Sequence, residues 1–338
     1  MQFVASITRN ASDIRKISRL WQGSGDTRNP LKNILITPLF TPPSTLKLIR
    51  EMRERGEIEQ VYFDSGGYFV QMGRLSYEDM YWYLLQFYRA NHWADWYVLP
   101  DYVPLSSDKE DEVWYKVRRT ADGSKLFFLE MPSSLQDKAL PVAQGSESKQ
   151  IEYCLETYVR LGVQQIGFGS FGTSGKSSSV NAVTSNSLKM LGELSEILTQ
   201  ERLNLHAFGV GNPPVIYLLN QAGVDSFDSV GWMKTAGFGK IFMPLTRAYN
   251  ITYRDPMARG LKEDAFYTLK ELSNHDCYFC QSFQKLRESR DYRVMHNLTV
   301  VLDTLEMIDK GLDSNLVERI LQTYSPAYAK LGRRDRDA

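Results

Sequence analysis

The stretch Val61-Tyr-Phe-Asp-Ser-Gly-Gly-Tyr-Phe-Val70 opens with three apolar residues, which precede a carboxylate, a serine and two glycines. The apolar residues are typical of a buried strand, and the glycines let a ligand approach the backbone closely. Many α/β enzymes present a catalytic group as a carboxylate at the carboxyl end of a strand. Residues 64–67 are also typical of an ordinary turn, so the stretch alone leaves both interpretations open.

Short β-type runs alternate with longer segments of helical periodicity up to about residue 230. This alternation is typical of parallel strands joined by crossover helices, and about eight strands fit a (β/α)8 TIM barrel better than a doubly wound sheet. We therefore predict an α/β fold with a (β/α)8 barrel over residues 1–254. The expected strands are 33–40, 61–64, 96–101, 126–131, 140–144, 165–169, 205–210 and 226–230, and the expected helices include 44–55, 77–90, 149–161, 185–200 and 213–222.

Several expected strands end on carboxylate, amide or glycine residues. The carboxyl ends of parallel barrel strands face one mouth, so we expect these groups to gather around one site unless their placement is chance. They include Asp64, Asp101, Gln144, Gly169, Gly209, Gly211 and Asp228.

Two segments depart from the alternation. Residues 105–124 are charged and irregular, and we expect a solvated loop there. Strand signals stop at residue 255, so we predict a metal-binding subdomain at 255–296, inserted near the C-terminus. The predicted helices at 297–330, the first over 297–310, then close the barrel, and residues 331–338 are expected to be a disordered tail.

Forty basic and forty acidic side chains give a formal net charge of zero. Any contact with nucleic acid therefore needs a local basic patch and not an overall cationic surface. No apolar run reaches the roughly eighteen residues of a membrane span, and the N-terminus shows no hydrophobic leader, so we expect a soluble cytoplasmic protein with no membrane partner. Three cysteines, an odd number, suit a reducing compartment.

One glycine-rich stretch comes close to a phosphate-binding loop. Gly169-Ser-Phe-Gly-Thr-Ser-Gly-Lys-Ser177 follows an expected strand and precedes an expected helix. The P-loop pattern requires a glycine where this chain has Ser170, and no later strand ends clearly in a Mg²⁺-binding Asp. A P-loop NTPase therefore stays an alternative, and a glycine-rich loop near a ligand is the better description.

The strongest chemical pattern is His275-x-Cys277-x2-Cys280-x15-His296. Two thiolates and two imidazoles suit a closed, tetrahedral Zn²⁺ site of structural type. The alternative is an exposed cysteine pair with ordinary surface histidines. The other histidines and cysteine, for which we expect core or surface roles, are His92, His206 and Cys154.

With these residues in place, the chain resembles the tRNA-guanine transglycosylase superfamily, zinc-containing (β/α)8 barrels that exchange guanine for a 7-deazaguanine. The resemblance runs from about residue 61 to about residue 298, and its motifs follow in order along the chain. They are Asp64-Ser-Gly-Gly-Tyr68, Gln144-Gly145, Gly209-Val-Gly-Asn-Pro213, Gly223-Val-Asp-Ser-Phe-Asp228 and the metal pattern that ends in His296-Asn-Leu298.

The resemblance implies that Asp228 is the nucleophile and Asp64 the general acid and base. Breaking the glycosidic bond to guanine develops oxocarbenium character at C1′, which a carboxylate on the far face can trap covalently. The departing guanine must gain a proton and the incoming base must lose one, which suits a second carboxyl group in the same mouth.

The resemblance also implies a pocket for the exchanged base. Asp101 would accept hydrogen bonds from the N1–H and 2-amino edge of guanine, although a turn aspartate is the alternative. Gln144 would donate to the O6 side. The other hydrogen-bonding groups expected there belong to Ser65, Gly169 and Ser170.

Two aromatic residues fall where the superfamily stacks the base between apolar faces. By resemblance, Tyr68 and Phe208 form these faces, and stacking of this kind is worth roughly 1 to 3 kcal/mol per base. Composition alone favours a core role for both side chains.

Some positions depart from the superfamily pattern. His275 replaces the first zinc-binding cysteine, and the spacing from Cys280 to His296 is shorter, which indicates a trimmed metal subdomain. Phe69 replaces a glutamine of the tRNA enzymes. Where bacterial tRNA enzymes carry a Pro-Thr-Arg segment that grips the anticodon loop, this chain has Gly231-Trp-Met-Lys-Thr-Ala-Gly-Phe-Gly-Lys240, and it has no room for the RNA-binding domain of archaeal enzymes.

These departures are similar to the DpdA branch, whose members place 7-deazaguanines in DNA. We therefore predict a DNA guanine transglycosylase that uses a base such as preQ0 and a structural Zn²⁺. A duplex target would have to be opened or its base flipped. A helicase or ATPase partner and a homodimer stay open possibilities.

Phosphate contacts are expected from a few basic residues after the nucleophile, with a solvated face as the alternative. They are Lys234, Lys240, Arg247, Arg254 and Arg259. Two further functions compete with DNA modification. One is a tRNA-guanine transglycosylase of queuosine or archaeosine type with a divergent anticodon grip, and the other is a non-catalytic zinc-containing subunit of such an enzyme.

Overall fold

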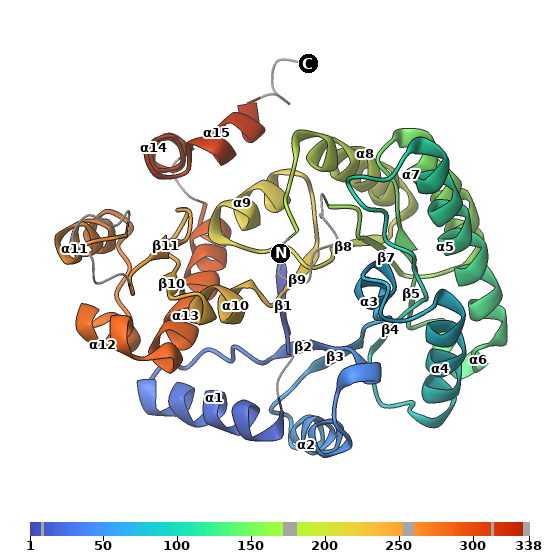
Figure 1. The fold of residues 1–338 in the computed structure, drawn as a ribbon, viewed down its shortest axis with the longest axis horizontal. Helices are drawn as coiled ribbons and strands as arrows, with labels where there is room; N and C mark the ends of the chain where they lie inside the picture. Colours follow the sequence, from blue (N-terminus) through green and yellow to red (C-terminus); the bar gives the residue numbers. More distant parts are fainter. Residues whose placement is uncertain (8–9, 172–180, 253–259, 312–313, 334–338) are drawn as a thin grey trace.

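The computed structural model describes residues 1–7, 10–171, 181–252, 260–311 and 314–333. Its centre is a parallel sheet with the strand order β5-β4-β3-β2-β1-β9-β8-β7-β6 (Figure 1). The strands are β1 (Gln2–Ser6), β2 (Asn33–Ile36), β3 (Gln60–Phe63), β4 (Trp96–Val98), β5 (Ala139–Leu140), β6 (Val142–Ala143), β7 (Gln165–Phe168), β8 (Asn204–Ala207) and β9 (Ser226–Ser229).

The two end strands of this sheet, β5 and β6, belong to one chain segment that Pro141 interrupts. The amide of Leu99 donates to the carbonyl of Leu140, and the amide of Gly167 donates to the carbonyl of Pro141. The segment therefore pairs with β4 on one side and β7 on the other, although proline has no N–H to give to the ladder. The sheet closes on itself, and the predicted α/β barrel is confirmed.

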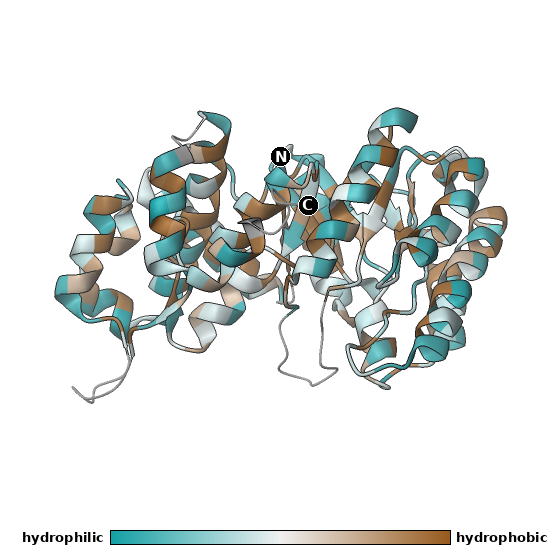
Figure 2. Ribbon diagram, turned by 90° about the horizontal axis from the view of Figure 1, so that it is seen from above, coloured by the Kyte–Doolittle hydropathy of each residue, from teal (hydrophilic) through white to brown (hydrophobic). Residues whose placement is uncertain are grey.

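Helices surround the barrel because each buries one apolar stripe against the strands. In Figure 2, hydrophilic residues lie mainly on the outer faces of these helices. The longer helices up to the last barrel strand are α1 (Ala11–Ser24), α2 (Pro43–Glu54), α4 (Tyr77–Ala90), α5 (Glu110–Glu130), α7 (Ser148–Tyr158), α8 (Ser185–Glu201) and α9 (Pro213–Gln221). The shorter ones are η1 (Pro38–Phe40), α3 (Gly67–Gln71), α6 (Ser133–Gln136) and η2 (Val159–Leu161).

The chain after β9 forms a mainly helical C-terminal region. The long helix α13 packs against α10, α9 and α1, so it covers the barrel next to the first helix. Figure 1 shows α11 and α12 on the side of the molecule away from α5. The elements are α10 (Gly231–Gly237), an antiparallel pair of β10 (Lys240–Ile241) and β11 (Tyr249–Asn250), α11 (Glu263–Leu272), η3 (Tyr278–Cys280), α12 (Phe283–Glu288), α13 (Arg290–Asp309), α14 (Ser314–Tyr324) and α15 (Pro326–Arg333).

Two sequence predictions between β4 and β5 are wrong. The expected strand at 126–131 and the latter part of the expected loop at 105–124 both belong to helix α5. The apolar run contains Phe127 and Phe128, which are buried, but Leu126 and Leu129 are exposed, as the sides of a helix require. The charged start of α5 holds three carboxylates in its first turn, where they stabilise the helix dipole.

One missed strand and several boundaries also differ from the sequence predictions, including the expected strand at 33–40, where residues 38–40 form η1. Strand β1 was not expected. It is a short apolar run at the start of the chain, and such a run is a weak strand signal. Helix α13 begins seven residues before the expected helix at 297–310. Helix α15 extends into the segment expected to be a disordered tail, of which residues 334–338 lie outside the described part of the chain. No helix among the described residues is long and apolar enough to cross a membrane.

Candidate active site and metal centre

A cavity of about 710 Å³ lies where the barrel strands end. This volume is in the range of small-molecule binding sites. Three of the expected site residues, Gln144, Ser170 and Lys240, do not line this cavity. The expected site residues that line the cavity are Asp64, Ser65, Tyr68, Asp101, Gly169, Phe208, Asp228 and Lys234.

Asp228 is a buried residue of β9, and both of its carboxylate oxygens accept hydrogen bonds. The hydroxyl of Ser6, at the end of β1, donates to Oδ2. The amide of Gly209 donates to Oδ1 at 2.7 Å. These two hydrogen bonds fix the orientation of the carboxyl group. Ser6 could not be predicted as a site residue, because β1 and β9 become neighbours only in the folded sheet.

His206 lies behind Asp228 in the barrel interior and is completely buried. Its Nδ1 is 2.8 Å from the hydroxyl of Ser226, which also accepts a 2.9 Å hydrogen bond from the Gln165 amide. Its Nε2 is 3.5 Å from Oδ1 of Asp228. His206 has the expected position in the core. It also lies beside a carboxylate of the cavity, because β8 pairs with β9.

Asp64 follows β3 and faces the same cavity as Asp228. The hydroxyl of Thr37 donates to its Oδ2 at 2.7 Å. Burial raises the pKa of Asp64 from 3.8 to about 7, and the Thr37 hydrogen bond opposes this shift only in part. A carboxyl group of this pKa can both give and take a proton near neutral pH.

Asp101 is buried at the end of a short network of polar side chains. The Ser65 hydroxyl donates to its Oδ1 at 2.5 Å, and the Gln144 amide donates to its Oδ2 at 2.7 Å. The Ser170 hydroxyl donates to Oε1 of Gln144 at 2.6 Å. The amide of Gln144 thus holds Asp101, and burial raises the pKa of the Asp101 carboxyl.

Two glycines let this network pack against the backbone. A Cβ atom on Gly67 would lie 2.3 Å from Oδ1 of Asp101, and one on Gly169 would lie 2.6 Å from Nε2 of Gln144. Both distances are shorter than any side chain tolerates, so a larger residue would displace the polar group. Glycine is therefore required for close approach at these two positions, although at Gly67 the group that approaches is the Asp101 side chain and not the ligand expected from the sequence.

Some of the residues expected to stack on the base or to contact phosphate line the cavity, and others do not. Tyr68 and Phe208 both line the cavity and are half-buried. The ammonium of Lys234 is 5.9 Å from the centre of the Tyr68 ring. Burial lowers the pKa of Lys234. Arg247 lies over the ring of Tyr249 instead, at 4.8 Å. Two expected cations, Arg254 and Arg259, and the P-loop-like residues 172–177 lie outside the described part of the chain.

The predicted metal ligands come together in one buried group. His275, Cys277, Cys280 and His296 each offer one ligand atom, and these atoms lie within 4.8 Å of one another. Nε2 of His275 is 3.4 Å from Nδ1 of His296, which is 3.5 Å from Sγ of Cys277. Such a group can hold a metal ion, and the alternative of an exposed cysteine pair is wrong.

The far nitrogens of both histidines have partners that the sequence did not reveal. Nδ1 of His275 is 2.6 Å from Oδ2 of Asp303, and Nε2 of His296 is 2.9 Å from the carbonyl of Phe242. Arg28 in turn donates to Asp303 at 2.7 Å. These contacts point the remaining nitrogen of each ring toward the thiols, as outer partners of metal-binding histidines do.

A family model described as queuine tRNA-ribosyltransferase (TGT) matches residues 92–330, which is more than two thirds of the chain. The chain belongs to this family. It is therefore a guanine transglycosylase, a pentosyltransferase enzyme. The match contains Asp101, Asp228 and the metal group, and it begins after Asp64. No curated protein matches this TGT-family chain significantly.

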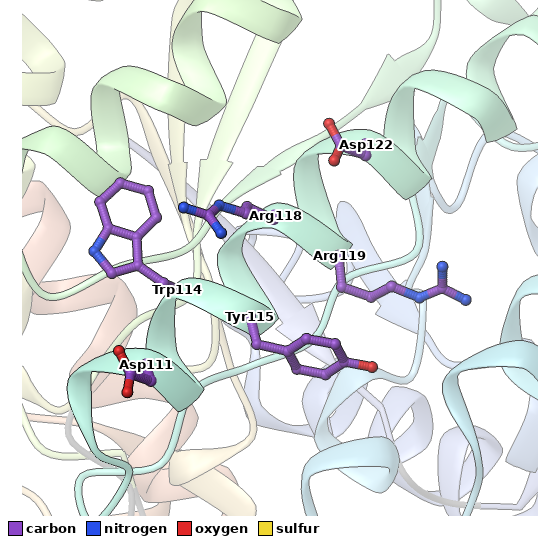
Figure 3. Close-up of a pocket in the computed structure, with 6 residues that line it drawn as sticks. All are labelled: Asp111, Trp114, Tyr115, Arg118, Arg119 and Asp122. Carbon is purple, nitrogen blue, oxygen red and sulfur yellow. The ribbon is translucent and has the colours of Figure 1, made fainter.

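A second pocket of the TGT-family chain is lined by residues of α5 (Figure 3). Its volume is about 430 Å³. The guanidinium of Arg118 stacks over the ring of Trp114 at 5.3 Å. Tyr115 is exposed, while Asp111 and Asp122 add negative charge to the pocket lining. None of the motifs that predict base exchange falls in this pocket.

Proposed function

We propose that the chain exchanges a guanine in DNA for a 7-deazaguanine base such as preQ0, through a covalent intermediate on Asp228. The observation that carries the proposal is the presence of Asp228 and Asp64 in one cavity with different surroundings. Asp228 is fixed by two hydrogen bonds, whereas Asp64 has a raised pKa. Two carboxyl groups with separate environments are suited to separate roles in one reaction.

In the proposed mechanism, a carboxylate oxygen of Asp228 bonds to C1′ of the nucleotide as the bond from C1′ to N9 of guanine breaks. The electron pair of the broken bond stays on guanine, which takes a proton from Asp64. The incoming base then gives a proton to Asp64, and its nitrogen displaces Asp228 from C1′. The acid and base roles of Asp64 restore each other, so no other reactant is needed.

The buried Asp101 is proposed to recognise the base. The N1–H and 2-amino groups of guanine and of preQ0 are donors, and an anchored carboxyl group is the matching acceptor. Ser65 and Gln144 hold that group from behind. Tyr68 and Phe208 would cover the faces of the base.

We propose that the metal group holds a structural Zn²⁺. Two sulfur and two nitrogen donors fit the preference of zinc, and both histidines are oriented by outer partners. A bound ion would supply folding free energy to the C-terminal region and no step of the reaction. We also propose that residues 255–296 form the metal subdomain.

Two sequence features support DNA as the substrate. Phe69 stands where the tRNA enzymes carry a glutamine, and the segment 231–240 stands where the bacterial tRNA enzymes carry the segment that grips the anticodon loop. In this chain Phe69 and Phe238 line the cavity. The second candidate substrate is tRNA, because the matching family model is described as a queuine tRNA-ribosyltransferase.

Labelled guanine separates these candidates. The purified protein would be incubated with radiolabelled guanine and either single-stranded DNA, duplex DNA or tRNA, and the label in the polymer would be counted. We expect label in DNA and its replacement when unlabelled preQ0 is added. Label in tRNA alone would show that the tRNA candidate is correct, and no label in any polymer would favour a non-catalytic subunit.

A further inference from the structure

The mouth of the catalytic cavity carries phenylalanine rings that are open to solvent. Phe40 is 50% exposed and Phe238 is 58% exposed, and both line the cavity. Burying a side chain of this size is worth about 1.5 to 3 kcal/mol. Large apolar groups that stay exposed beside a polar site mark a surface that another molecule covers.

The rings stand on two sides of the strand that ends in Ser6. Phe40 belongs to η1 after β2 and stacks on Phe69 of α3 after β3, with ring centres 3.7 Å apart. Phe238 ends α10, which follows β9. Strand β1 lies between β2 and β9 in the sheet, so the two aromatic groups flank the part of the cavity that holds Asp228.

Positive charge accompanies the rings at the same mouth. Lys234 lies on α10 four residues before Phe238, which is the C-cap residue of that helix, and both residues line the cavity. Arg74 follows α3, is exposed and lines the cavity. Neither cation forms a salt bridge with a described residue. The carboxylates in the lining are Asp64, Asp101 and Asp228, which stand at the strand ends.

From this arrangement we propose that the rim residues, Phe40, Phe69, Arg74, Lys234 and Phe238, hold an unpaired DNA strand on both sides of the exchanged guanine. Bases next to the guanine stack on the rings, and the phosphates between them contact the two cations. Alternating aromatic and basic groups are the usual means of binding single strands. In a duplex the base faces are already covered, so the rim selects unpaired DNA.

The inference rests on the proposed function for its occupant, but binding can be measured without catalysis. The probe is a fluorescent 12-nucleotide DNA with one central guanine, either single-stranded or paired to its complement, and the readout is anisotropy. Wild type is compared with Phe40→Ala, Phe238→Ala and Phe238→Trp. The matched control is Trp82→Ala, because Trp82 is 56% exposed on α4 and lies outside the cavity lining.

We expect the wild type to bind the single strand more tightly than the duplex. Each rim alanine variant should raise the Kd for the single strand at least about fivefold, since stacking contributes roughly 1 to 3 kcal/mol per base. Phe238→Trp and Trp82→Ala should bind like the wild type. Unchanged affinity in both rim variants, or tighter binding of the duplex, would overturn the inference.

Exchange assays on the same variants separate this inference from the proposed function. If labelled guanine enters DNA but the rim variants bind and react like the wild type, the rim inference fails alone. If the rim variants lose DNA binding while the wild type exchanges no base, the proposed function fails and the binding surface stands. If a partner protein covers the rim instead, DNA binding will not depend on the rim residues. That result would also overturn the inference.

Discussion

Nε2 of His206 lies 3.5 Å from Oδ1 of Asp228 and makes no hydrogen bond with any described residue. The amide nitrogen of Gln165 can only donate to the Ser226 hydroxyl, which leaves that hydroxyl free to donate to Nδ1 of His206. A neutral ring then carries its proton on Nε2, facing the carboxylate. The chain of hydrogen bonds therefore runs from Gln165 through Ser226 to His206, whose Nε2 faces Asp228 without a hydrogen bond.

This relationship predicts that His206 positions Asp228, the proposed nucleophile. Replacing it with leucine removes the N–H group that faces Asp228 at 3.5 Å, and a weak polar contact of about 0.5 to 1.5 kcal/mol corresponds to roughly a 2- to 13-fold loss of kcat. His206→Gln keeps a donor near Nε2 and should recover most of the rate. KM for the free base should change little, because His206 is outside the cavity lining. Equal losses in both variants, or a loss in KM alone, would contradict the prediction.

Asp64 should make stability fall as the pH rises. Its pKa is about 7 in the folded chain against an ordinary value of 3.8, so between these values the folded chain keeps a proton that the unfolded chain has released. The free energy of unfolding therefore decreases across this range. Asp64→Asn removes the effect and should melt at a higher temperature than wild type at about pH 8.

Thermal unfolding of the asparagine variant checks this sign. The difference in Tm should shrink as the pH is lowered to about 4.5. Asp137→Asn is the matched control, because Asp137 is exposed and lies outside the cavity lining, and it should show no such trend. A variant less stable than wild type at pH 8 would show that Asp64 is not penalised by burial. Base exchange should be lost in Asp64→Asn at every pH, because asparagine carries no transferable proton.

Gly67→Ala should damage base recognition without unfolding the barrel. The added Cβ meets Oδ1 of Asp101 at 2.3 Å and must push that carboxyl group out of its network. Lost hydrogen bonds of this kind cost about 1 to 3 kcal/mol, so KM for free guanine should rise at least about fivefold. Gly192→Ala is the control, since a Cβ there meets nothing within 4 Å in helix α8. That change should leave KM unchanged, and a rise in both variants would argue against the network.

Metal analysis tests the buried cluster. We expect about one zinc per chain, in a closed site of four ligands. Cys277→Ser should lose the ion and lower the Tm together, because zinc binding adds folding free energy. Cys154→Ala should keep the ion, because Cys154 is buried away from the cluster. Asp303→Asn should weaken zinc affinity about 10- to 100-fold by freeing the His275 ring. A metal-free wild type of equal stability would refute the site.

The sequence predicts the barrel and the gathering of polar residues at one cavity because both depend on local patterns. Asp64 and Asp101 were found from their positions just after apolar runs, since strand ends share one mouth. The four metal ligands were found because thiol and imidazole groups at that spacing are rare by chance. The local pattern fails in residues 126–131, because this apolar run fits a strand and a helix equally well. Only the burial of its side chains in the folded chain distinguishes the two.

The supporting residues could not be predicted, because they come from distant parts of the chain. Ser6 meets Asp228 across 222 positions, and Thr37 meets Asp64 across 27. Asp303 lies 28 positions from His275 and is one acidic residue among many on a helix. Strand pairing and helix docking make these contacts, and neither leaves a signal in a single sequence.

Trapping the covalent intermediate would show whether Asp228 attacks C1′ of the nucleotide. Wild type and Asp228→Ala would be mixed with a guanine-containing single-stranded DNA, quenched with denaturant, and analysed by intact mass spectrometry. The account predicts a species whose mass is the protein plus the strand minus guanine for wild type, with the strand attached to Asp228 after proteolysis, and none for the variant. The same adduct in Asp228→Ala, or attachment at another residue, would contradict it.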